Sequence, residues 1–255
     1  MGTSRFSGPI LYSGDGAENK WFTNLPIGNN PDYFTLMDDF LGIDIDDTDD
    51  WTKEVLNSGT LTLLADHVGG WAKSTGDGST DNSGGSIQGN EVFMAEASKN
   101  IFFESRVAVA DADDMDMFVG LAENGTFATG VPFTANNQIG FLLVEGAADI
   151  YANCDSGGTQ TNTDTGVDFA DGAESSSNIT NTRQLGFIVK GTGVVEFYVD
   201  RAKVTTTTDN IPTSAMTPWF AAMSGTTTAD AAWCDYIFAT GQRITSGMTQ
   251  YGSPV

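Results

Sequence analysis

The chain has 255 residues, which is enough for one large domain or two small ones. It carries 11 Lys and Arg residues against 34 Asp and Glu residues, so its formal net charge is -23. This balance argues against nucleic acid and against an anionic membrane surface as partners, because both require a basic footprint. Hydrophobic residues make up 40% of the chain. No apolar run approaches the roughly 20 residues of a membrane span, so we expect a folded, acidic protein without membrane segments.

Residues 1–35 show no regular apolar pattern. Three prolines in this segment, Pro9, Pro26 and Pro31, oppose both helix and central strand. Exposed aromatic rings on a flexible segment would be an association hazard, so rings placed here are expected to dock on something. We predict an extended N-terminal arm over residues 1–35 that lies across a neighbouring copy or another protein surface, packing on its own domain being the alternative. The expected anchors are the four aromatic residues Phe6, Tyr12, Trp21 and Phe22.

The first residues carry no recognisable targeting signal. An apolar segment typical of a secretory leader is missing, and a myristoylation motif would need Ser or Thr where Phe6 stands. Cys154 and Cys234 are the only cysteines, and one pair in a chain of this length is no disulfide framework. We therefore expect a protein made in a cytoplasm, with two free thiols.

From Phe34 onward, short apolar runs alternate with turn residues. The clearest alternation lies in 100–110, where Ile101, Phe103 and Val107 share one face. A hairpin is predicted over 184–200, with its turn at 190–193. Two segments rich in Gly, Ser, Thr, Asn and Asp are predicted to be loops, 75–89 and 156–182. Further strands are predicted at 60–64, 115–121, 138–144, 216–223 and 231–239.

The spacing of apolar residues also excludes a helical fold. No window of about 12 residues shows the 3.6-residue period of an amphipathic helix. About ten or more short strands with Gly, Asn and Asp turns are typical of a β-sandwich or jelly roll. We predict an all-β fold, a jelly-roll sandwich of two antiparallel sheets over residues 36–255, preceded by the arm.

Two acidic clusters could hold a hard cation such as Ca²⁺, which prefers oxygen ligands. An EF-hand loop beginning at Asp44 is excluded, because its sixth and twelfth positions are Asp49 and Val55 rather than Gly and Glu. The leading interpretation is two solvated acidic turns, and no cofactor is expected. A divalent cation site is the alternative, with ligands from Asp44, Asp46, Asp49, Asp111, Asp113 and Asp116.

The sequence offers no strong catalytic motif. A retaining glycoside hydrolase needs two carboxylates about 5 Å apart, and laminarinase-like enzymes carry them as Glu-x-Asp-x-x-Glu on one strand. The nearest match here is Glu196 with Asp200, and no second Glu follows. His67 is the only histidine, which excludes a zinc site built on several histidines. Trp71 and Trp219 could stack on sugars, although core tryptophans are commoner. The chain is predicted not to be an enzyme, with no catalytic residues.

The order of several short segments resembles a known family. The segments 34–41, 103–107, 118–121, 195–200 and 234–237 follow the order seen in concanavalin A-like virion proteins of tailed bacteriophages. The resemblance covers about residues 34–243. One departure is Asp200-Arg201, where the family has Asp-Gly; a type I′ turn requires positive φ at both positions, which Arg tolerates poorly.

This resemblance implies a capsid decoration, or cement, protein. Such a jelly roll would be made in the host cytoplasm, sit on the outer capsid surface of the virion and contact the major capsid protein. The charge fits, because DNA phosphate inside a capsid would repel this chain. Local three-fold positions between capsomers would favour a homotrimer. The alternatives are a carbohydrate-binding, lectin-like module for host adsorption and, third, a laminarinase-like glycoside hydrolase. A lectin would show exposed Trp and Tyr on a concave sheet, whereas a cement protein would show a flat or capped one.

Overall fold

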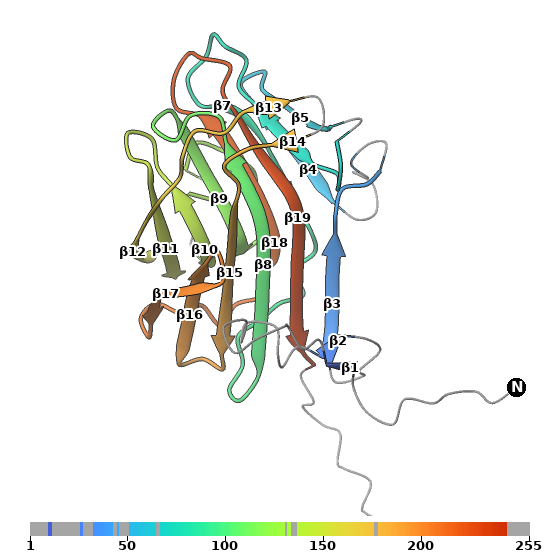
Figure 1. Cartoon of the computed structure of the whole chain (residues 1–255). Coiled ribbons are helices and arrows are strands. Elements are labelled where there is room, and N and C mark those ends of the chain that lie inside the picture. The colour runs from blue at the N-terminus through green and yellow to red at the C-terminus, as the bar shows by residue number, and fades with distance from the viewer. Residues whose placement is uncertain are drawn as a thin grey trace, which may run out of the picture.

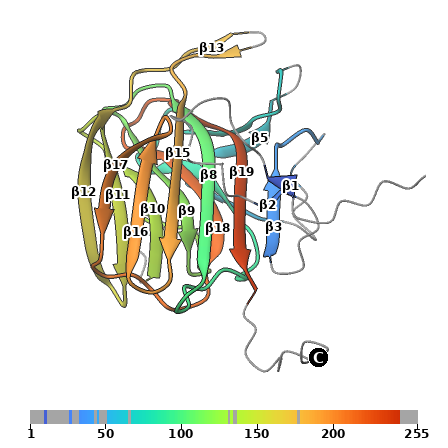
Figure 2. The ribbon, with the colours of Figure 1, turned by 60° about the horizontal axis from the view of Figure 1, so that its bottom comes forward.

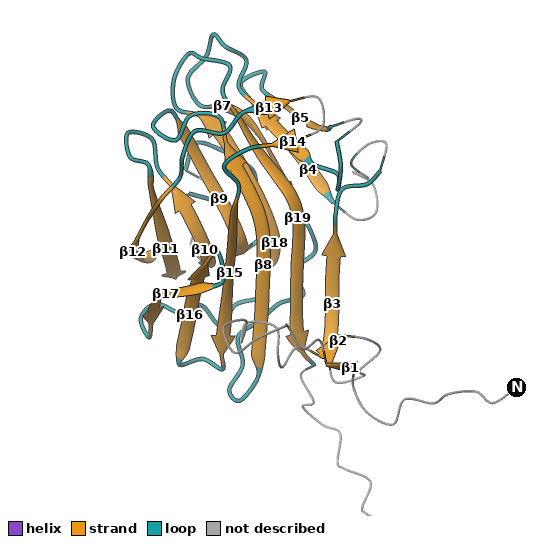
Figure 3. Ribbon diagram, in the orientation of Figure 1, coloured by secondary structure: helices purple, strands orange, loops and turns teal. Residues whose placement is uncertain are grey.

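A computed structural model describes residues 10–11, 26–27, 33–42, 45, 51–64, 67–130, 132–133, 137–175 and 178–243. These residues form strands and loops, with no helix among them (Figure 3). Within these ranges there is accordingly no helix long and apolar enough to cross a membrane. Two large antiparallel sheets pack face to face (Figure 1), and Figure 2 shows their strands in two layers. The predicted all-β sandwich is confirmed.

The first sheet has seven strands in the order β12-β11-β10-β9-β18-β7-β4, with every neighbouring pair antiparallel. Strands β4 and β12 form its two edges, and β9 and β10 lie near its middle. The bounds are β4 Thr52–Leu56, β7 Ser83–Gln88, β9 Met115–Ala122, β10 Asn137–Leu143, β11 Asp149–Ser156, β12 Thr159–Asp168 and β18 Thr217–Ser224.

The second sheet has eight strands, seven of them in the order β17-β16-β15-β8-β19-β6-β5. The eighth, β3, pairs with the later half of β19, beyond the part that pairs with β6. Strand β3 begins at Tyr33, whereas the sequence placed the domain boundary at residue 36. The bounds are β3 Tyr33–Asp38, β5 Thr60–Leu63, β6 Ala72–Thr75, β8 Asn100–Val109, β15 Arg183–Lys190, β16 Val194–Val199, β17 Ala202–Thr207 and β19 Ala231–Gln242.

Two small two-stranded sheets complete the described structure. Strand β1 (Ile10–Leu11) pairs with β2 (Pro26–Ile27), and β13 (Glu174–Ser175) pairs with β14 (Asn178–Ile179). Strand β13 projects beyond the end of the sandwich in Figure 2. The predicted arm anchors Phe6, Tyr12, Trp21 and Phe22 all lie outside the described residues, so the arm stays a prediction.

Aromatic side chains from both sheets fill the space between them. Phe103 of β8 and Phe187 of β15 stack with ring centroids 5.0 Å apart. Phe141 of the seven-stranded sheet meets Phe197 of the other sheet edge-on, at 5.4 Å. All four rings are fully or almost fully buried, and burying such a side chain contributes about 1.5–3 kcal/mol. The alternation predicted for 100–110 therefore places its apolar residues in the core.

The prediction of a loop over 75–89 is wrong, because β7 lies within it. This strand reads Ser-Gly-Gly-Ser-Ile-Gln and is buried throughout, between β18 and β4. A Cβ atom on Gly84 would lie only 2.1 Å from the carbonyl oxygen of Ala222. The glycine that resembled a loop signal in the sequence thus marks a strand whose backbone is approached closely by its neighbour.

The loop predicted over 156–182 is also wrong in part, because β12 occupies 159–168. This strand is an edge strand that pairs only with β11, and its residues are exposed or half-buried along its whole length. Its four threonines are β-branched and favour extended backbone. The sequence pattern did not indicate β12 because its apolar residues do not alternate: Val167 is its only large hydrophobic residue.

The turn between β16 and β17 has type I′ geometry, which the sequence Asp200-Arg201 had made doubtful. Asp200 has φ of 50° and Arg201 has φ of 69°, as a type I′ turn requires. The Arg201 Nε atom donates a hydrogen bond of 2.8 Å to Oε1 of Gln184. A left-handed conformation costs a residue with a side chain roughly 1–2 kcal/mol, so this hydrogen bond offsets part of the strain at Arg201.

Replacing Arg201 by glycine should relieve that strain. We expect Arg201→Gly to raise the free energy of unfolding by about 0.5–1 kcal/mol. Arg201→Ala is the matched control, since it keeps the strain and loses the hydrogen bond, and it should lower stability by about 0.5–1 kcal/mol. Urea unfolding of the three proteins measures both effects. A glycine variant less stable than the alanine variant would contradict this account.

Candidate functional site

The outer face of the seven-stranded sheet consists of the side chains that point away from the second sheet. On β10, Ile139 and Phe141 belong to the core between the sheets. Successive strand residues point to opposite faces, so Gln138, Gly140 and Leu142 point outward. Leu142 accordingly belongs to a separate hydrophobic cluster on this face.

One transverse row of this face combines amide side chains with bare backbone. Residues paired across neighbouring strands share a face, so the registers place Asn162, Asn153, Gly140, Gly120, Trp219 and Gln88 in one row. A Cβ atom on Gly120 would lie 2.3 Å from the carbonyl oxygen of Ile139, so the middle of the row has no room for side chains. Polar groups of Asn153 and Trp219 flank this bare stretch.

The loop from β9 to β10, described over 123–130 and 132–133, covers the outer face. At one edge of the sheet, the backbone N–H of Phe127 donates to a carboxylate oxygen of Glu54 on β4. At the opposite edge, Nε2 of Gln160 on β12 donates to the carbonyl oxygen of Phe133, at 3.2 Å. Because β4 and β12 are the edge strands, this loop reaches across the whole sheet.

Further contacts hold the loop against the sheet. The Gln88 amide donates to the carbonyl oxygen of Gly125 at 2.7 Å and accepts from its N–H at 3.2 Å. The buried rings of Phe127 and Phe133 join the outer hydrophobic cluster with Trp219. The face is thus capped, and Trp219 is buried on it rather than exposed as the lectin alternative expected.

Buried polar atoms without a partner concentrate on this face. Among the described residues, eight buried side-chain nitrogen or oxygen atoms have no hydrogen-bond partner, and six of them point outward here. Each such atom costs roughly 1–3 kcal/mol if it stays unsatisfied. Six would cost about as much as the 5–15 kcal/mol by which a domain is usually stable. These atoms therefore need partners beyond the described residues: Ser86 Oγ, Gln138 Nε2 and Oε1, Asn153 Oδ1, Asp155 Oδ1 and Trp219 Nε1.

The chemistry of these six atoms fits hydroxyl groups. The Trp219 indole N–H only donates. The free oxygen of Asn153 only accepts, as does that of Asp155 when its carboxyl group is ionised. The Gln138 amide and the Ser86 hydroxyl both donate and accept. Burial raises the pKa of Asp155, although a hydrogen bond from the N–H of Gly158 opposes the increase. Water molecules or the hydroxyl groups of a neutral ligand can each satisfy such a mixed set.

The carboxylate pair weighed in the sequence lies on the other sheet. Glu196 forms an ion pair with Lys190 at 2.7 Å and accepts a hydrogen bond from the Tyr198 hydroxyl at 3.0 Å. Asp200 forms an ion pair with Arg183 at 2.8 Å. Both carboxylates are thus engaged in contacts that hold neighbouring strands together.

Apart from Trp219, which the sequence offered as a residue that could stack on sugars, the residues of the outer face escaped sequence reasoning. Gln138, Asn153 and Ser86 are single polar residues within strands and form no motif. The only available signal was the alternation of Gln138, Gly140 and Leu142 with apolar residues in the predicted strand 138–144. That alternation indicates a face without indicating what it binds.

The predicted metal ligands divide between described and undescribed parts of the chain. Asp44, Asp46 and Asp49 lie outside the described residues. Asp111 and Asp113 lie in the turn between β8 and β9, and Asp116 is the second residue of β9. Across the described ranges, no three His, Cys, Asp or Glu side chains are placed to hold a metal ion together. Calcium binding stays a prediction.

Acidic side chains nevertheless crowd the end of the sandwich around this turn. Partial burial raises the pKa of Asp116, and the charge of Asp81 adds to the increase. The pKa of Glu145 is raised by loss of hydration and then by Asp116. Loss of hydration and the charge of Asp111 raise the pKa of Asp230. These carboxylates therefore destabilise the folded state when all are ionised.

This crowding predicts a pH dependence of stability. A carboxyl group whose pKa is raised by folding contributes stability at low pH that is lost as the pH rises through its folded pKa. We expect the melting temperature to be higher by about 1–3 °C at pH 5 than at pH 7, at constant ionic strength. Asp116→Asn should raise the melting temperature at pH 7 and flatten the profile. A melting temperature that rises with pH would contradict the prediction.

Calcium provides a separate test of the acidic clusters. If they are solvated, millimolar calcium should raise the melting temperature no more than sodium at matched ionic strength, since both then act by screening. Thermal unfolding followed by circular dichroism measures the difference. A larger shift specific to calcium would establish a binding site instead.

Comparisons with known proteins identify the fold. No protein-family model matches the chain, and no curated protein matches it. Among solved structures, the catalytic domain of an endo-1,3-beta-glucanase (laminarinase) from Thermotoga petrophila RKU-1 has a TM-score of 0.54 and 13% identity, covering 84% of this chain and 99% of that one. The Bacillus licheniformis beta-glucanase has a TM-score of 0.54 and 13% identity, covering 82% and 98%. The metal-free carbohydrate recognition domain of Emp46p has a TM-score of 0.50 and 10% identity, covering 79% and 94%.

At these identities the likeness establishes the fold alone. The predicted concanavalin A-like jelly roll is confirmed, while no structure named here concerns a phage capsid. The prediction that the chain is not an enzyme is corrected, because structures sharing its fold include glycoside hydrolases. That prediction rested on the missing pair of carboxylates and on the resemblance to virion proteins, and a shared jelly roll cannot separate structural proteins from enzymes.

Proposed function

We propose that the chain binds a neutral carbohydrate on the outer face of the seven-stranded sheet, beneath the loop that joins β9 to β10. Capsid decoration, which the sequence resemblance implied, has no support in the comparisons, so carbohydrate recognition is the leading proposal. The fold shared with glucanases and a carbohydrate recognition domain favours it. The observation that carries it is the group of six buried, unpartnered polar atoms on this face.

The ligand class follows from the chemistry of the face. Sugar hydroxyl groups donate and accept hydrogen bonds, as this mixed set requires. An anionic sugar is disfavoured by Asp155 and by the net charge of the chain.

Hydrolysis of the bound sugar would place particular demands on Asp155. A general acid must hold its proton at the working pH, and burial shifts the pKa of Asp155 upward, in the direction that this role requires. Glycoside hydrolysis also requires a second carboxylate, about 5 Å away or roughly 6.5–9.5 Å away. Other outward carboxylates include Asp164 and Glu54 on the edge strands β12 and β4, Asp149 on β11 and Asp116 on β9. Binding experiments should therefore also follow the release of reducing ends.

A substitution at Gln138 separates a ligand-binding role from a structural one. Gln138→Met keeps the length of the side chain and removes two buried, unpartnered atoms, so it should leave stability unchanged or higher. The same variant should weaken binding of β-1,3-linked gluco-oligosaccharides at least about tenfold, or 1.4 kcal/mol. Isothermal titration calorimetry and thermal unfolding measure the two effects.

The matched control lies on the other sheet. Thr206 is exposed on β17, and Thr206→Ala should change neither binding nor stability. Asn153→Ala and Trp219→Phe should weaken binding, the latter while retaining an aromatic ring. A glycan array that shows no neutral carbohydrate ligand, or a Gln138→Met variant that binds as the parent does, would refute the proposal.

A further inference from the structure

Exposed apolar side chains gather around β3. Seven large hydrophobic residues are exposed among the described ones, and four of them lie on or next to β3 and the facing segment 90–94. Soluble proteins rarely leave such side chains clustered in water unless the surface binds something. The four, with their exposed fractions, are Met37 at 55%, Leu41 at 67%, Val92 at 51% and Met94 at 37%.

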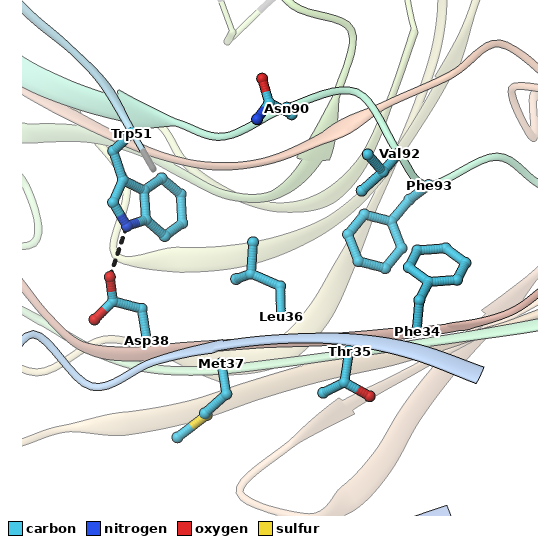
Figure 4. A pocket seen from close by; sticks show the side chains of 9 residues that line it. All are labelled: Phe34, Thr35, Leu36, Met37, Asp38, Trp51, Asn90, Val92 and Phe93. Carbon is cyan, nitrogen blue, oxygen red and sulfur yellow. Dashed lines mark hydrogen bonds between the residues drawn. The ribbon is translucent and has the colours of Figure 1, made fainter. Parts of the chain in front are cut away.

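A groove of about 410 Å³ lies between β3 and this segment (Figure 4). The rings of Phe34 and Phe93, 5.0 Å apart, lie at one end. Trp51 lies at the other end, where its indole N–H donates to Asp38 at 2.6 Å. Leu36 projects between these ends. The groove is therefore lined by aromatic and aliphatic side chains, with the Asp38 carboxylate at the Trp51 end.

The backbone beside this groove is also available for pairing. Strand β3 pairs with β19 along one edge, and its other edge has no strand partner among the described residues. An open edge presents N–H and C=O groups that another extended segment can pair with. An open strand edge next to a side-chain groove is the arrangement by which proteins capture an extended peptide.

Charge indicates which part of a second copy could approach. Residues 33–255 carry 9 cations and 31 acids, a net charge of -22, so two sandwich domains repel each other. Residues 1–32 carry 2 cations and 3 acids, a net charge of -1. This segment also contains all four predicted anchors: Phe6, Tyr12, Trp21 and Phe22. It is thus the part of the chain that can reach an acidic surface with little repulsion and with rings to bury.

Among the described residues, no part of the chain's own segment pairs with the open edge of β3. Its described strands, β1 and β2, pair with each other and not with β3. The five residues between β2 and β3 can span up to roughly 20 Å when extended, which lets the paired strands β1 and β2 stand away from their own sandwich and approach a neighbouring molecule. We propose that the segment 1–32 of a second copy docks along the open edge of β3, with the ring of Trp21 or Phe22 in the groove.

Cysteine cross-linking between two variants tests this docking directly. Trp21→Cys in one copy and Val92→Cys in another should form a disulfide-linked dimer under mild oxidation, with Phe22→Cys as a second probe of the arm. The native Cys154 and Cys234 are buried, and burial raises the pKa of both thiols, so they will not compete. A mass tag on one variant shows that the two different chains are joined.

The same pair in one chain tests the opposite outcome. A double variant that closes the disulfide within its own monomer would mean that the arm packs on its own domain, and would overturn the proposal. Failure of both arm probes to link with Val92→Cys would overturn it as well.

Surface substitutions provide an independent measurement. Val92→Arg places a charge at the groove and should raise the concentration at which the full chain dissociates at least about tenfold. Val144→Arg is the matched control, since Val144 is 43% exposed and follows β10 of the other sheet. Light scattering over a micromolar series at moderate salt measures association, with circular dichroism confirming that each variant is folded. A parent chain that stays monomeric, or equal effects of both substitutions, would refute the proposal; neither result bears on carbohydrate binding.

Discussion

Ile139, Phe141 and Leu143 of β10 are fully buried between the two sheets, and their burial turns the residues between them to the opposite side. This alternation links the core to the candidate site. The same strand that contributes its apolar half to the sandwich must present Gln138 and Gly140 outward, in the middle of a seven-stranded sheet. Neighbouring strands alternate in the same way. Their outward residues therefore come into register and form the transverse row that crosses the sheet.

The buried polar groups on the two outer faces of the sandwich differ in whether they have hydrogen-bond partners. On the eight-stranded sheet, Glu104 is almost fully buried and accepts hydrogen bonds from Tyr236 at 2.6 Å and Gln184 at 2.8 Å. Beside it, Asp235 pairs with Arg106, and burial raises the pKa of this aspartate to about 6 even though the arginine lowers it. On the seven-stranded sheet, six comparable atoms have no partner among the described residues. The contrast supports a binding role for that face.

Sequence reasoning reached the parts of this structure whose apolar residues alternate. Strands β8, β15 and β16 were predictable because their inward positions are Phe, Val, Ile and Leu. Strands β7 and β12 were not, because a close backbone approach requires Gly84 in one and threonine supplies the extended propensity of the other. The candidate site was out of reach for a further reason: single amides such as Asn153 acquire a role only when the register brings them into one row. Core-facing residues identify the fold, whereas outward residues determine function.

The two proposals concern different parts of the molecule, and their combination has a physical consequence. Strand β3 belongs to the eight-stranded sheet, so a neighbour docked on its edge leaves the outer face of the seven-stranded sheet uncovered. An assembly joined through β3 would therefore present several carbohydrate-binding faces at once. Linked sites bind a repetitive polymer more tightly than single sites by roughly 10²–10⁴, without any new contact. A face that binds neutral sugars weakly, as hydrogen bonds to hydroxyl groups usually do, gains most from such linkage. Self-association would then raise the affinity of the protein for long glycans and leave its affinity for short glycans unchanged.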